Sequence, residues 1–175
     1  MSSPVFTQQA LNKGMVEAVE FVHAEGWDAS PTLFALVPTA LIAEHIELDD
    51  ESPLTLVVQD NLPDTIEPGS EELADYVSRV AWPREVAGVV LAQEIMFRDT
   101  SAEDPSPRPA RLFSGCLREE GIEQTLLQLR PTEQELADAG LFAHDDIQLR
   151  GGSQVAPGVI AALRYGLSLD PDELY

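Results

Sequence analysis

Basic side chains are scarce in this chain of 175 residues, which has one lysine and nine arginines against 31 acidic residues. No Lys or Arg stands between Lys13 and Arg79, so the first 78 residues carry −14 of the net charge of −21. A negative field of this size disfavours nucleic-acid phosphates and anionic lipid, and it favours basic partners or cations. We therefore expect no direct contact with nucleic acid or with a membrane.

Cysteine and long apolar runs are also scarce. The single cysteine, Cys116, excludes a disulfide within the chain and is typical of a reducing compartment. No segment approaches the ~18 apolar residues of a membrane-spanning helix. Residues 1–9 lack the basic and apolar regions of a secretory signal. These features favour a cytoplasmic location.

Hydrophobic residues make up 44% of the chain, which is enough for one core, so we expect a single domain over residues 1–175. Apolar spacing predicts an α+β fold: a largely antiparallel sheet of about five strands with N-terminal, middle and C-terminal helices around it. The predicted helices span residues 8–25, 71–82, 132–139 and 157–168. The predicted strands span residues 33–37, 54–58, 86–97, 111–118 and 123–130.

Local signals give finer expectations for some of these segments. Thr7 is suited to cap the first helix and Gly26 to end it, whereas Gly14 inside it costs about 1 kcal/mol relative to Ala. In the hairpin formed by the last two strands, we expect one core face. Its members are Phe113, Leu117, Leu127 and Leu129. The Pro-rich segment 99–110 is predicted to be a mobile loop.

Residues with catalytic or metal-binding chemistry are few. His45 stands beside Asp49, Asp50 and Glu51, and His144 precedes two aspartates. Oxygen ligands of this kind suit a divalent cation, but the calcium-loop pattern and a second His or Cys pair are missing, so solvated acidic loops are the main alternative. Cys116 falls within a predicted strand, as expected of a small buried side chain.

Other polar residues have structural interpretations. We expect Arg118, Arg130 and Glu94 to form charge pairs across the sheet, and His23 to lie half-buried or exposed on the first helix. The indole of Trp82 is expected to pack in the core. Motifs for phosphate, dinucleotide or zinc-protease chemistry are absent from the sequence. We therefore assign no catalytic residue, no cofactor and no metal site.

Four segments resemble an uncharacterised family of acidic, single-domain actinobacterial proteins. The most specific is Trp-Pro-x-x-Val-Ala-Gly, and the segments lie at residues 31–39, 82–94, 111–118 and 155–163. The resemblance implies a single domain and adds no catalytic residue, and the long segment 130–152 departs from it. In size, charge and element order the chain is also similar to small acidic secretion chaperones, which is an analogy of fold alone.

These observations favour a non-catalytic binding or regulatory protein, chaperone-like, that engages a basic or amphipathic protein partner. The acidic residues Asp49, Asp50 and Glu51 are the predicted partner-binding residues. The alternative is a metal-assisted hydrolase that uses His45 or His144 with nearby carboxylates. Because uncovered sheet edges are commonly paired across a two-fold axis, a homodimer is also favoured.

Overall fold

The computed structural model describes residues 7–39, 54–59, 66–67, 70–98, 106–119, 121–139, 149–151 and 157–169. In these residues a single antiparallel sheet has the strand order β2-β1-β3-β4-β5-β6. The strands are β1 (Thr32–Pro38), β2 (Leu54–Gln59), β3 (Gly88–Phe97), β4 (Arg108–Leu117), β5 (Glu123–Leu129) and the two-residue β6 (Arg150–Gly151). The helices are α1 (Gln8–Glu25), α2 (Glu71–Ser78), α3 (Glu133–Ala139) and α4 (Pro157–Ser168). The predicted α+β class is confirmed.

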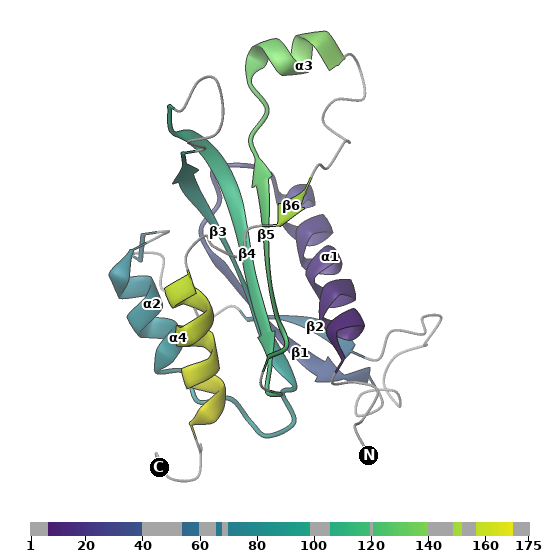
Figure 1. The fold of residues 1–175 in the computed structure, drawn as a ribbon, viewed down its shortest axis with the longest axis vertical. Helices are drawn as coiled ribbons and strands as arrows, with labels where there is room; N and C mark the ends of the chain where they lie inside the picture. The colour runs from purple at the N-terminus through teal and green to yellow at the C-terminus, as the bar shows by residue number, and fades with distance from the viewer. Residues whose placement is uncertain are drawn as a thin grey trace.

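The sheet is the middle of three layers. Helix α1 lies on one face, α2 and α4 lie on the other, and α3 stands beyond the end of the sheet (Figure 1). The side chains of strand β3 point alternately to the two faces of the sheet, so this strand contributes to both cores. Val90 and Ala92 pack with α1, whereas Val89 and Leu91 pack with α2 and α4. The strand predicted at residues 86–97 is confirmed as β3, which begins at Gly88.

Helix α1 begins and ends at the predicted residues. The Thr7 hydroxyl oxygen accepts a hydrogen bond from the Ala10 N–H at 3.1 Å, and Gly26 ends the helix with a φ of 95°. Gly14 faces the sheet, where a Cβ would lie 2.8 Å from Cδ2 of Leu36. The glycine therefore lets the helix pack closely on β1, which offsets its low helix propensity.

The predicted core face of the hairpin is wrong. Phe113 and Leu117 pack with α1, whereas Leu127 belongs to a cluster on the opposite face of the sheet that Leu129 flanks. The register explains the error, because Phe113 pairs with Leu126 and Leu112 pairs with Leu127, and directly paired residues share a face. Both faces of this hairpin are covered, so both carry apolar side chains.

The Pro-rich segment is shorter than the predicted loop 99–110. Strand β4 already begins at Arg108, and Pro109 pairs with Met96 of β3 while its carbonyl accepts the N–H of Arg130 at 2.9 Å. Residues 99–105 lie outside the described part of the chain, so mobility there stays a prediction. The sequence prediction also missed β6, which pairs with β5 through Arg150 and Gly151.

Candidate functional site

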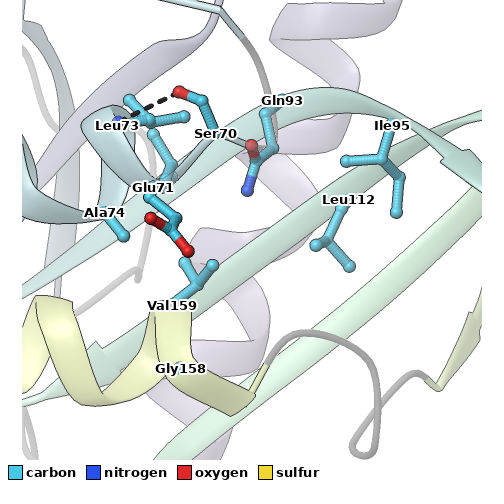
Figure 2. A pocket seen from close by; sticks show the side chains of 10 residues that line it. Ser70, Glu71, Leu73, Ala74, Gln93, Ile95, Leu112, Gly158 and Val159 are labelled. Carbon is cyan, nitrogen blue, oxygen red and sulfur yellow. Dashed lines mark hydrogen bonds between the residues drawn. The ribbon is translucent and has the colours of Figure 1, made fainter.

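A groove of about 280 Å³ opens between the N-terminal ends of α2 and α4, over strands β3 and β4 (Figure 2). This volume lies near the lower end of the range of pockets that hold small ligands. Apolar side chains form most of its wall. The lining residues are Ser70, Glu71, Leu73, Ala74, Leu91, Gln93, Ile95, Leu112, Gly158 and Val159.

The two helical walls are held by the close packing of α2 against α4. At Gly166 of α4, a Cβ would lie 2.8 Å from the carbonyl oxygen of Val77 and 2.9 Å from that of Val80. Only a glycine allows this approach. At the other end of α2, the Ser70 hydroxyl accepts the N–H of Leu73 at 3.1 Å, which caps the helix. The groove is therefore built on well-anchored helices.

Two polar side chains enter this apolar space. Figure 2 shows the Glu71 carboxylate directed toward Val159 on α4, and the Gln93 carboxamide projecting from β3 into the groove. Gln93 is only 4% exposed, whereas Glu71 is exposed at the rim. Among the described lining residues, Glu71 is the one with an ionisable side chain. Such a site is suited to hold an apolar group with a positive charge beside it.

The walls differ in charge. Helix α2 carries Glu71, Glu72 and Asp75, of which Asp75 is paired with Arg79 at 3.2 Å. The segment 157–163 of α4 has no charged residue. The first turn of α2 thus presents two carboxylates at its positive end, which stabilises the helix and makes this rim of the groove acidic.

The partner-binding and metal-binding residues predicted from the sequence, Asp49, Asp50, Glu51, His45 and His144, lie outside the described part of the chain. These assignments stay predictions. In the described ranges, no group of three His, Cys, Asp or Glu side chains is arranged to hold a metal ion. The described helices also include none that is long and apolar enough to cross a bilayer.

Cys116 is fully buried on β4, as the sequence predicts for a small core side chain. It packs in the cluster beneath α2 and α4. Burial raises the pKa of its thiol to about 12, because the thiolate would lose its hydration; the nearby Arg164 opposes this shift and Glu123 adds to it. A thiol of this kind is a poor nucleophile at neutral pH.

We expect Cys116 to resist modification in the native protein. At pH 8 its thiol stays protonated, because that pH lies well below the raised pKa, and its sulfur is closed to solvent. A disulfide reagent such as dithiobis(nitrobenzoate) should release colour only when urea is added. Release of one equivalent within seconds from folded protein would contradict this burial.

The predicted charge pairs across the sheet are wrong for Arg118 and Arg130. Arg118 donates hydrogen bonds to backbone carbonyls, and Arg130 pairs with Asp28, in the segment after α1, at 3.0 Å. Glu94 stands opposite Arg111 in the strand register, while its Oε2 accepts the N–H of Ala29 at 2.6 Å. The sequence could not show these partners because they lie on segments far apart in the chain.

Sequence reasoning also missed a buried arginine on the α1 face of the sheet. Arg111 is 1% exposed, and its Nη1 lies 3.1 Å from Oε1 of Gln128 and 3.3 Å from Nδ1 of His23. Its guanidinium carbon lies 4.0 Å from the ring centre of Trp27. His23 is half-buried, in agreement with its predicted place. The only signal in the sequence was an arginine among apolar residues at 110–113.

Comparison with known proteins identifies the family. The model of the PPA1309-like protein family matches residues 11–168. The chain belongs to this family. The PPA1309-like match runs from the first turns of α1 to the end of α4 and so includes every lining residue of the groove. It also confirms the resemblance to an uncharacterised family. Searches of curated proteins and of solved structures return no match for this PPA1309-like chain.

Proposed function

We propose that this protein is a non-catalytic binding protein that holds a basic amphipathic segment of a protein partner in the groove between α2 and α4. The observation that carries the proposal is the combination of an apolar lining with an acidic rim. Leu91, Ile95 and Leu112 line the groove from strands β3 and β4, and the exposed Glu71 stands at the mouth. An apolar side chain of the partner gains from burial on this floor.

Charge complementarity selects the occupant. The chain has a net charge of −21, and the wall formed by α2 adds Glu71 and Glu72 beside the groove. A partner with lysine or arginine next to its apolar anchor is attracted, whereas an acidic segment is repelled. The predicted acidic residues Asp49, Asp50 and Glu51 would extend the same attraction.

A designed peptide pair tests this proposal. We expect a labelled Leu/Lys amphipathic peptide to bind, and a Leu/Glu peptide of equal length to stay free, because only the first matches both the floor and the rim. A Ser/Lys peptide, which keeps the charge and lacks the anchor, should bind roughly tenfold or more weakly, which corresponds to about 1.4 kcal/mol or more. Fluorescence anisotropy at low and high salt measures all three, and high salt should weaken each cationic complex.

Two substitutions at one position localise the binding. A Cβ on Gly158 meets no atom within 4 Å, so Gly158→Trp can fill the mouth of the groove without a clash at its base, and Gly158→Ala is the matched control. We expect the Trp variant to lose Leu/Lys binding and the Ala variant to keep it. Equal affinity for both variants would place any binding elsewhere on the acidic surface. Neutralising Asp49, Asp50 and Glu51 together then tests that surface.

We also propose a cellular location and an oligomeric state, each on an observation of its own. A single, buried cysteine fits a reducing compartment, so we place the protein in the cytoplasm. In the described part of the sheet, β2 is an outer strand, and Val57 on it is 39% exposed. We propose that two copies pair to cover such an edge.

A further inference from the structure

The guanidinium of Arg111 is buried, and in the described part of the chain only one of its three nitrogens has a hydrogen-bond partner. Its Nη1 is engaged with Gln128 and His23, but Nε and Nη2 have no hydrogen-bond partner among the residues that the structure describes. These two nitrogens form the side-on fork of the guanidinium, whose parallel N–H groups match the two oxygens of a carboxylate. A buried donor without a partner is rare in folded proteins, and it points to a group that binds there.

The face of the same guanidinium is covered, whereas the fork lies in the plane of the group. Trp27 stacks on the face at 4.0 Å, and Arg130 approaches the same ring at 5.4 Å. Because stacking uses the face of the guanidinium and hydrogen bonds use its edge, the indole does not itself occupy Nε and Nη2. The segment 26–31 carries Trp27 over this site. Two contacts fasten this segment to the sheet: Asp28 forms an ion pair with Arg130, and the Ala29 N–H donates a hydrogen bond to Glu94.

Neighbouring charges define what the fork can accept. Burial lowers the pKa of Arg111, the carboxylate of Glu94 opposes that shift, and Arg130 adds to it. Both arginines favour an anion, yet Glu94 and Asp28 stand close by and disfavour a second negative charge. A monoanion is therefore preferred over a dianion such as phosphate. Glu94 does not itself occupy the fork: its Oε2 accepts the Ala29 N–H, and neither Nε nor Nη2 of Arg111 has a partner in the described part of the chain.

We propose that the Nε and Nη2 edge of Arg111 binds the carboxylate of a small monoanionic ligand beneath the segment 26–31. The site is separate from the groove, because Leu112, the next residue of β4, points to the opposite face of the sheet. The carboxylate accepts two parallel N–H bonds and lies beside the indole of Trp27. This gives the protein a small-molecule site in addition to its partner groove.

Acetate is the probe for this site, with chloride at equal ionic strength and pH as the reference. We expect acetate to raise the melting temperature and to change the tryptophan emission in a saturable way, because it binds the native state next to Trp27. In Trp27→Phe the emission change should disappear while the melting shift remains. Phosphate should produce a smaller shift than acetate.

Two arginine variants test whether Arg111 causes the response to acetate. In Arg111→Lys, which keeps the charge and lacks the fork, the apparent affinity for acetate should fall roughly tenfold or more. Arg98→Met removes an exposed arginine at the end of β3 and should leave the response unchanged. Equal behaviour of the wild-type protein in acetate and chloride would overturn the proposal, and this measurement needs no variant to fold. An acetate response that survives in Arg111→Lys would also overturn it.

Discussion

Replacing Arg118 by alanine should lower the free energy of unfolding by about 3 kcal/mol. Its guanidinium donates to the carbonyls of Val86 at 2.6 Å and Pro83 at 2.9 Å, and it also bonds the carbonyls of Trp82 and Leu167. One side chain thus joins the end of β4 to the segment before β3 and to the end of α4. Without it, the part-buried carbonyls of Val86, Trp82 and Leu167 lose a charged donor.

Urea unfolding followed by circular dichroism measures this loss. Arg79→Ala is the control, because Arg79 makes an exposed pair with Asp75 whose side chains are 76% and 57% exposed. Its effect should stay within about 0.5 kcal/mol. Arg118→Lys should recover part of the stability, since an ammonium group cannot reach carbonyls on both sides at once. Equal stability of Arg118→Ala and wild-type protein would show that the carbonyls find other donors.

Adding one methyl group at two positions of α4 should have opposite effects. Gly166→Ala forces a Cβ to within 3 Å of the Val77 and Val80 carbonyl oxygens, and backbone atoms yield little, so we expect a loss of about 2 kcal/mol. Gly158→Ala meets open space and improves helix propensity, so it should add up to about 1 kcal/mol.

Thermal and urea unfolding of the two alanine variants give the comparison directly. Because Gly166 sets the distance between α2 and α4, its variant should also weaken peptide binding in the groove, whereas Gly158→Ala should not. A stabilised Gly166→Ala protein would mean that the two helices separate at no cost, and the groove would then not be a rigid site.

Local rules predicted most of the elements correctly, because their signals are short-range. Thr7 and Gly26 bound α1, Ser70 caps α2, and α4 spans its predicted residues. The Thr132 hydroxyl accepts the N–H of Glu135 at 3.1 Å, as expected for a capping box. In a capping box the Glu135 carboxylate would bond the backbone N–H of Thr132. Here it accepts a hydrogen bond from Nη2 of Arg108 at 3.1 Å.

The sequence could not show the features that depend on the order of the strands in the sheet. Alternation predicted two faces for each strand, but it could not show that both faces of the β4–β5 hairpin are covered, so Phe113 and Leu127 were placed on one face. The groove combines α2 with α4, which starts at residue 157, and only the tertiary fold brings them together. The environment of Arg111 likewise depends on its neighbours Glu94 and Gln128, which the register of three strands determines.

The sheet also has a consequence for synthesis on the ribosome. The apolar side of α1 packs partly on Phe113 and Leu117 of β4, so it emerges almost a hundred residues before these partners. At ordinary translation rates the delay is on the order of ten seconds. During that interval the nascent chain exposes apolar surface, and its first 78 residues already carry a charge of −14. Mutual repulsion between such chains on neighbouring ribosomes then limits their aggregation until β4 arrives.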